Sequence, residues 1–176
     1  ALGRCAHYAG QYPVAIKADL QAIEFNPEDL TAHLLLAATY AQTGAYADSV
    51  EHFRFVTQAA PANPDAWLGL SDIQHHLGQS RNAIETLNAA VQAIPENAEI
   101  HLLLGQILLR EQSLTPAVAS LEKAYDLSHL QGCGWPHPVH DQAALLYGQA
   151  LAQLGQYELA REVLAEVYEN SELSKA

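Results

Sequence analysis

The chain has 176 residues, 49% hydrophobic and 16% charged, and twenty acidic against eight basic side chains give it a formal net charge of −12. Such a charge repels phosphate backbones and anionic lipid headgroups, which excludes nucleic acid as an expected partner. No apolar run approaches the ~20 residues needed to cross a bilayer, so we expect no membrane insertion of this chain.

A short motif that begins with glycine recurs along the chain. It reads Gly-Gln-Tyr from Gly10, Gly-Ala-Tyr from Gly44, Gly-Gln-Ser from Gly78 and Gly-Gln-Tyr from Gly155. The first three glycines are 34 residues apart, and one further period reaches Gln112, where the glycine is lost. The next motif follows after 43 residues, so nine residues are inserted between the fourth and fifth units. A fixed period of this length is typical of helical repeat proteins.

Each unit is predicted to contain two short amphipathic helices, because apolar residues recur every three or four places. In the second unit Leu36 and Tyr40 precede the glycine, and Val50, Phe53 and Val56 follow it. Glycine in the left-handed conformation ends a helix at no steric cost, which predicts a tight helical hairpin at each junction. A small residue stands five positions after each junction, at Ala15, Ser49, Ala83, Ala117 and Ala160.

The units are predicted to form a single array over residues 1–176. In chain order they cover 1–28, 29–62, 63–96, 97–130 and 141–170, with an insertion at 128–140 and a tail at 171–176. Asn63 and Asn97 are predicted to cap the first helices of the third and fourth units, and Thr115-Pro116 to begin the second helix of the fourth.

Other positions in the units follow the pattern of a known family, which sets an aromatic residue and then Leu-Gly in the first helix. The third and fourth units carry this pattern as Trp67, Leu70 and Ser71, and as His101, Leu104 and Gly105. The second-helix pattern of that family appears as Ala83, Leu87, Ala90 and Pro95. The chain therefore resembles the tetratricopeptide repeat family over nearly its whole length. The resemblance implies an all-α fold, a right-handed α-solenoid of stacked antiparallel helical hairpins.

The first unit matches this pattern only in part. Leu2-Gly3 corresponds to the Leu-Gly of a first helix whose opening residues are absent. We therefore expect the chain to be a fragment of a longer protein. An alternative function follows, in which the chain is a non-catalytic repeat segment of a larger enzyme or assembly factor.

The resemblance also implies a binding site, since the first helices of stacked repeats line a concave groove. The groove positions of the family fall here on one leucine per repeat and on polar side chains beside it. They are Leu34, Ala38, Leu68, Asp72, His75, Leu102, Gln106, Arg110, Leu145 and Gln149. We expect this groove to bind an extended peptide or a helix of a partner protein, and the chain to act as an interaction scaffold.

The partner is predicted to be a protein or peptide, basic or amphipathic in character. The net charge favours a basic partner, as do Glu158, Glu162, Glu166 and Glu169, which lie three or four residues apart on the last predicted helix. Some members of the family bind C-terminal carboxylates through paired Lys and Asn, but the corresponding positions here are Leu, Ala, Asp and Gln. Self-association is also compatible with the sequence, because the ends of a repeat stack are often apolar.

The insertion concentrates side chains that could bind a metal ion. His129, Cys133, His137, His140 and Asp141 lie within it or at its end, and thiolate and imidazole groups are good zinc ligands. The spacing matches no zinc signature, so a surface loop without metal is the favoured interpretation. A metal-ordered recognition loop at 129–141 is kept as an alternative.

Nothing in the chain has the pattern of a catalytic or cofactor site. A Cys-His-Asp set in the insertion is the only hint of nucleophilic chemistry, and phosphate-binding loops and metalloprotease motifs are absent from the sequence. We therefore expect no enzyme activity and no cofactor. Cys5 and Cys133 lie three repeats apart, too far for a disulfide, and they do not assign a compartment.

Overall fold

A computed structural model describes residues 2–130 and 138–173 of the chain. All the regular structure in these residues is α-helical, and none of the helices there is long and apolar enough to span a membrane. The helices are α1 (Leu2–Tyr8), α2 (Tyr12–Phe25), α3 (Leu30–Thr43), α4 (Tyr46–Ala59), α5 (Pro64–His76), α6 (Ser80–Ala93), α7 (Ala98–Arg110), α8 (Leu114–Leu130), α9 (Pro138–Gln153) and α10 (Tyr157–Leu173). They divide into two compact units, Ala1–Thr86 and Leu87–Ala176, whose boundary falls inside α6.

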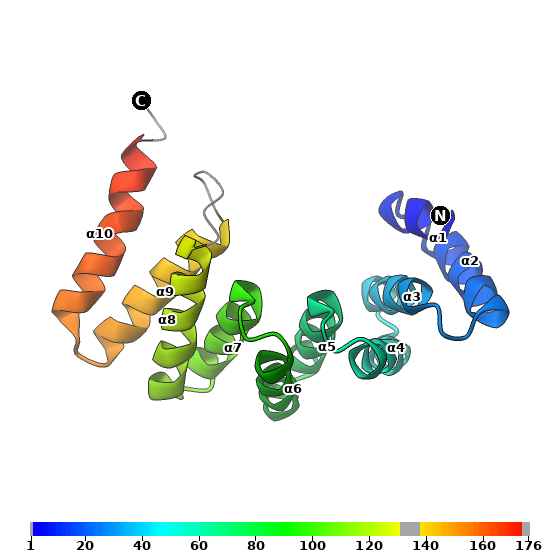
Figure 1. The fold of residues 1–176 in the computed structure, drawn as a ribbon, viewed down its shortest axis with the longest axis horizontal. Helices are drawn as coiled ribbons and strands as arrows, with labels where there is room; N and C mark the ends of the chain where they lie inside the picture. Colours follow the sequence, from blue (N-terminus) through cyan, green and yellow to red (C-terminus); the bar gives the residue numbers. More distant parts are fainter. Residues whose placement is uncertain (1, 131–137, 174–176) are drawn as a thin grey trace. The chain divides into compact units, whose positions relative to one another are not determined.

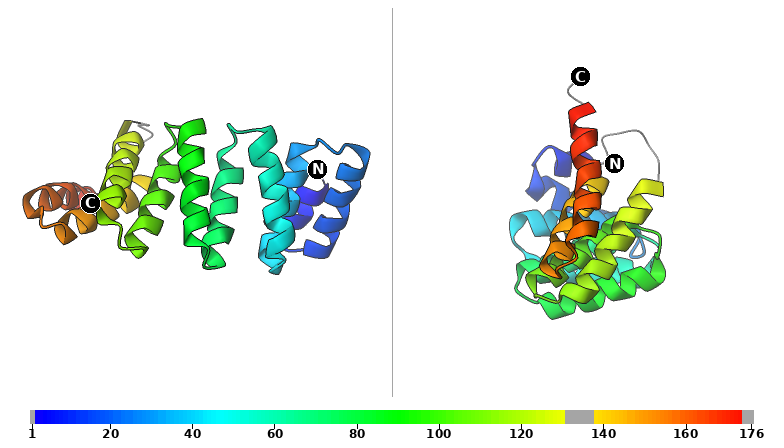
Figure 2. Two further views of the ribbon diagram at one scale, coloured as in Figure 1. Left: turned by 90° about the horizontal axis from the view of Figure 1, so that it is seen from below. Right: turned by 90° about the vertical axis from the view of Figure 1, so that its left-hand side faces the viewer.

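Within each unit the helices pack as antiparallel pairs that stack on one another. In the first unit α1 packs on α2 and α3 on α4, and the first helices of successive pairs, α1, α3 and α5, also touch (Figure 1). In the second unit α7 packs on α8 and α9 on α10, and α7 contacts α9; the left view in Figure 2 shows α7 and α8 side by side. The predicted all-α fold built of helical hairpins is confirmed.

The junctions of the hairpins have the backbone conformation that the glycine motif predicts. Gly10, Gly44, Gly78 and Gly155 have φ angles between 70° and 80°. At the fourth junction Gln112 has a φ of 58°. It is the only residue other than glycine that has a positive φ in the described part of the chain. The left-handed turn is therefore retained where the glycine is lost, at a cost in backbone strain.

The predicted caps hold the starts of two helices. The Asn63 side chain accepts a hydrogen bond from the backbone N–H of Ala66 (3.4 Å), and that of Asn97 from the N–H of Ile100 (3.0 Å). The second helix of the fourth unit differs, because α8 begins at Leu114, ahead of the predicted start at Thr115-Pro116. Proline needs no N–H partner in the first turn, so it is tolerated just inside the helix.

The two helices of a hairpin approach each other closely at a small residue of the first helix. A Cβ atom added to Gly105 would lie 2.5 Å from Cγ of Leu121, and Gly148 meets a leucine of α10 in the same way. In the second hairpin Ala37 takes this position, and Ser49 donates a hydrogen bond to its carbonyl oxygen (2.6 Å). The five small residues expected after the junctions are all buried.

A second contact recurs with the period of the repeat. In three hairpins a ring N–H in the first helix donates to a proline carbonyl oxygen six residues earlier. The pairs are His33 with Pro27 (3.0 Å), Trp67 with Pro61 (2.8 Å) and His101 with Pro95 (3.0 Å). Because a carbonyl only accepts, each histidine must carry a proton on Nε2. The contact fixes the loop that precedes each first helix.

The fourth and fifth hairpins are longer than the repeat pattern predicts. The insertion was predicted to begin at 128 and the fifth unit at 141, but α8 continues to Leu130 and α9 begins at Pro138. Ser128 and His140 are buried, and Ser128 Oγ lies 3.2 Å from Nδ1 of His140. This buried contact joins the last turn of α8 to the first turn of α9, and the bounds of the insertion stay a prediction.

The strained junction at Gln112 leads to a first prediction. Replacing Gln112 with Gly should raise the free energy of unfolding by about 0.5–1 kcal/mol, because glycine adopts positive φ without a Cβ penalty. The adjacent Glu111 has φ of −80°, so Glu111→Gly, a matched control, should destabilise the chain. Urea denaturation of both variants measures the difference. An equal effect of the two substitutions would contradict the strain at this junction.

The first hairpin carries a carboxyl group where the others place an apolar side chain. Asp19 lies against Gly3, in the position that Leu121 holds against Gly105. Only 4% of Asp19 is exposed, and its Oδ2 atom has no hydrogen-bond partner among the described residues. Burial raises the pKa of Asp19, an effect that the charge of His7 opposes. This carboxyl group therefore destabilises the first hairpin when it is ionised.

Replacing Asp19 with Leu should raise the free energy of unfolding at neutral pH by about 1–3 kcal/mol, the cost of an unsatisfied buried polar group. Because the pKa of Asp19 is higher in the folded chain than in the unfolded chain, protonation of Asp19 stabilises the fold. This stabilisation is fully present below pH 3.8, the ordinary pKa, and is lost as pH rises through the pKa of the folded state. Asp19→Leu and the uncharged control Asp19→Asn should both lack this pH dependence. Urea denaturation across a pH series measures it, and a wild-type profile in both variants would refute the argument.

Candidate functional site

A cleft of about 520 Å³ lies between α7 and α9 in the second unit. Its lining is made of glutamine and leucine side chains with a single arginine. The residues are Gln106, Leu109 and Arg110 of α7, and Gln142, Leu145, Leu146, Gln149 and Gln153 of α9. We call it the α7–α9 cleft.

Helical periodicity places these side chains on one face of each helix. On α9 the lining residues are spaced by three or four positions from Gln142 to Gln153. The opposite face of α9 is buried in the core of the second unit, through residues that include Ala143, Tyr147 and Leu151. The exposed face is thus left over after the core has formed, and α7 contributes its own exposed face beside it.

The chemistry of the α7–α9 cleft differs from that of the chain as a whole. None of its eight lining residues is acidic, although the chain has a net charge of −12. Four glutamine amides supply both hydrogen-bond donors and acceptors, and Leu145, which is 45% exposed, supplies apolar surface. Among these eight residues there is no nucleophile and no general base. These eight side chains offer amide hydrogen-bonding groups and apolar surface, but no groups for covalent chemistry.

Four of the ten residues expected in the groove line this cleft. They are Gln106, Arg110, Leu145 and Gln149. Leu102 does not join them, because it is only 6% exposed and packs in the core with Leu121 and Ala143. The Leu102 side chain is enclosed where α7 and α9 meet α8, and its role as a partner contact stays a prediction.

The other five expected groove residues belong to the first unit. Leu34 and Ala38 on α3 are half-buried and pack against the core formed with Phe53 and Ile73. On α5, Leu68 and His75 are half-buried and Asp72 is exposed. Their role as partner contacts stays a prediction.

Three residues that α9 contributes to the α7–α9 cleft were not predicted from the sequence. Gln142, Leu146 and Gln153 lie on the same face of α9 as Leu145 and Gln149. The spacing of three or four residues from Gln149 could have found them, because it defines one helical face. The groove positions taken from the family pattern number only two or three per repeat, so they did not include the rest of that face.

The predicted metal cluster is described only in part. Cys133 and His137 lie outside the described residues. The rings of His129 and His140 lie 5.6 Å apart between centroids, and Tyr125 stacks on His140 at 5.0 Å. Within residues 2–130 and 138–173, no group of three His, Cys, Asp or Glu side chains could hold a metal ion. The two described histidines pack with a tyrosine, and a metal-ordered loop stays a prediction.

The acidic face of the last helix is likewise described in part. Glu158 and Glu162 are exposed on α10, and Glu158 pairs with Arg161 at 3.1 Å. The side chains of Glu166 and Glu169 lie outside the described ones. An exposed pair three residues apart contributes little to stability, so this face is available to solvent and to charged partners.

Sequence models of one family match the chain in three places. Each is described as "Tetratricopeptide repeat", and the matches cover residues 42–107, residues 1–64 together with 134–174, and residues 98–128. Two of these matches include parts of α7, and one includes α9.

Among curated proteins, the chain is similar to Anaphase-promoting complex subunit 7 of Homo sapiens and of Mus musculus. Each is 26% identical over 104 residues, which is 59% of this chain and 18% of the subunit. The chain therefore spans less than a fifth of the length of these relatives.

Among solved structures, the chain is similar to MamA. One MamA crystal structure superimposes with a TM-score of 0.81 at 19% identity, covering 99% of this chain and 97% of that one. A MamA structure from Desulfovibrio magneticus RS-1 gives 0.77 at 19% identity, covering 99% and 93%. At these identities the likeness shows the fold alone.

Proposed function

The chain belongs to the tetratricopeptide repeat family of protein-interaction scaffolds, and on that premise we propose that its α7–α9 cleft binds a segment of a partner protein. The observation that carries the proposal is the lining of this cleft, in which Leu145 and Leu146 lie between glutamine amides on one face of α9. Such a surface suits a peptide, because amides bond its backbone while leucines contact its side chains.

The negative net charge of the chain favours a basic partner, but the lining of the α7–α9 cleft does not. Arg110 is the only charged residue in the lining, so a basic segment would meet a cation and no carboxylate there. We therefore propose a neutral segment. The acidic exposed face of α10, with Glu158 and Glu162, supports binding of a basic partner on that separate surface.

A second candidate function is a repeat segment within a larger protein. The match to Anaphase-promoting complex subunit 7 favours it, because 104 residues of this chain correspond to 18% of that subunit. In this role the chain would hold a longer protein, an enzyme or an assembly factor, in contact with its partners without catalysing a reaction itself. The full-length sequence distinguishes this role, because a catalytic domain would be evident from its motifs.

The binding function is tested with peptides selected from a display library of random linear sequences against the wild-type chain. The double substitution Leu145→Glu and Gln149→Glu should weaken their binding by about tenfold or more, because it removes a central apolar contact and places carboxylates in the cleft. Fluorescence anisotropy with labelled peptides measures the change.

The matched control is Leu20→Glu on α2 in the other unit, since Leu20 and Leu145 are both 45% exposed. It should leave affinity unchanged, and circular dichroism should show that all variants remain helical. If the selected peptides bind the double variant as tightly as the wild type, the α7–α9 cleft is not the binding site. A substitution at the buried Leu102 would test packing and not binding.

A further inference from the structure

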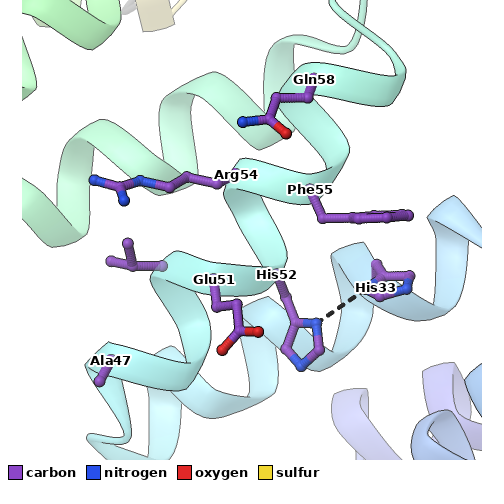
Figure 3. A pocket seen from close by; sticks show the side chains of 8 residues that line it. His33, Ala47, Glu51, His52, Arg54, Phe55 and Gln58 are labelled. Carbon is purple, nitrogen blue, oxygen red and sulfur yellow. Dashed lines mark hydrogen bonds between the residues drawn. The ribbon is translucent and has the colours of Figure 1, made fainter.

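A second concavity follows α4 in the first unit. It has a volume of about 390 Å³, and apolar, aromatic and charged side chains line it (Figure 3). The residues are His33, Ala47, Val50, Glu51, His52, Arg54, Phe55 and Gln58. We call it the α4 pocket; it shares no residue with the α7–α9 cleft, and the function proposed above makes no use of it.

Hydrogen bonds fix the tautomers of two histidines in the α4 pocket. His33 Nε2 lies 3.0 Å from the carbonyl oxygen of Pro27, so it donates and carries the proton. In the neutral ring Nδ1 of His33 is then an acceptor, and it lies 2.9 Å from Nδ1 of His52 (Figure 3). His52 must donate in this bond. Neutral His52 therefore has its proton on Nδ1 and a lone pair on Nε2.

The lone pair on His52 Nε2 has no partner among the described residues. That atom makes none of the hydrogen bonds of His52 and is not among the buried unsatisfied atoms, so solvent reaches it. Burial lowers the pKa of His52, helped by His33, while the carboxylates of Glu51 and Asp48 oppose the shift. At neutral pH the imidazole is uncharged, and Nε2 is a hydrogen-bond acceptor at the pocket.

Ring contacts hold this acceptor in place. His52 lies parallel to Tyr40, with ring centroids 5.9 Å apart and an interplanar angle of 9°. On the other side, His33 stacks on Phe55 at 4.1 Å, and Phe55 is 36% exposed. The rings of His52 and Phe55 are therefore already held by neighbouring rings before a ligand binds, which lowers the entropic cost of binding.

The charges around the pocket favour an uncharged ligand. Glu51 and Arg54 carry opposite charges, and His52 is neutral, so the lining has no excess of either sign at neutral pH. Val50 and Phe55 add apolar surface. A ligand that matches these features has an apolar ring, no charge and one hydrogen-bond donor.

We propose that the α4 pocket is a second binding site, which takes an aromatic side chain with an N–H donor, the indole of a tryptophan in a partner segment. The ring lies against the apolar side chains of the pocket, and the indole N–H donates to Nε2 of His52. Proline carbonyl, His33 and His52 form one chain of hydrogen bonds that keeps this acceptor facing the ligand.

This site has a distinctive dependence on pH. The groups that face His52 are His33 and Tyr40 from α3, and Asp48, Glu51 and Arg54 from its own helix. When pH falls through the lowered pKa of His52, a proton binds Nε2 and the acceptor becomes a donor. Indole binding therefore weakens as His52 is protonated.

The test uses N-acetyl-tryptophanamide as the probe and its N1-methyl derivative as the matched control without a donor. At about pH 8 the unmethylated probe should bind ~3- to 10-fold more tightly, the value of one hydrogen bond. At a lower pH, at which the nitrogen-15 shifts of the ring show His52 to be protonated, this preference should vanish. Titration followed by NMR of the His52 and Phe55 side chains measures both affinities and shows whether the fold persists.

Two further measurements keep the proposal falsifiable. Nitrogen-15 shifts of the His52 ring report its tautomer directly, and a proton on Nε2 at about pH 8 would overturn the proposal. His52→Phe retains a ring but no acceptor, so it should bind both probes equally. Equal binding of the two probes by the wild-type chain at high pH would also overturn it, as would shifts confined to residues outside the pocket.

Discussion

The structure depends on how closely the two helices of each hairpin approach at one small residue. At Gly105 and Gly148 there is no room for a Cβ atom, because a leucine of the second helix fills that space. Such contact is possible only when the junction turns tightly, and positive φ at Gly10, Gly44 and the other junctions provides that turn. A local backbone conformation thus determines the spacing of two helices over their whole length.

This spacing also determines where binding surfaces can form. Once second helices cover one side of the first helices, the first helices of successive hairpins contact each other, as α7 does α9. Their remaining faces lie side by side and form the α7–α9 cleft, with Gln106 from one helix and Gln149 from the other. The position of the cleft therefore follows from the stacking of the helices, while its glutamine and leucine side chains determine which groups it offers to a ligand.

The repeated hydrogen bond from a ring N–H to a proline carbonyl oxygen holds a loop in three hairpins, and in one of them it also determines the tautomer of a neighbouring histidine. Trp67 and His101 make the same contact, and among the described residues neither ring is joined to a second histidine by a hydrogen bond. At His33 the second ring nitrogen faces His52. The bond to Pro27 fixes the tautomer of His33, and the bond between the two rings then fixes the tautomer of His52. A tryptophan at this position would hold the loop equally well but could not accept from His52, since indole has only a donor.

The sequence by itself determined the helical hairpins, their 34-residue period, the left-handed junctions and the caps at Asn63 and Asn97, because these depend on residues close together in the chain. It also indicated four residues of the α7–α9 cleft, since groove positions recur with the repeat. Only the tertiary structure decided that Leu102 is enclosed in the core while Leu145 is exposed, and that His33 meets His52. Those outcomes depend on which other helices pack against a given face, and the pattern within one repeat contains no information about its neighbours.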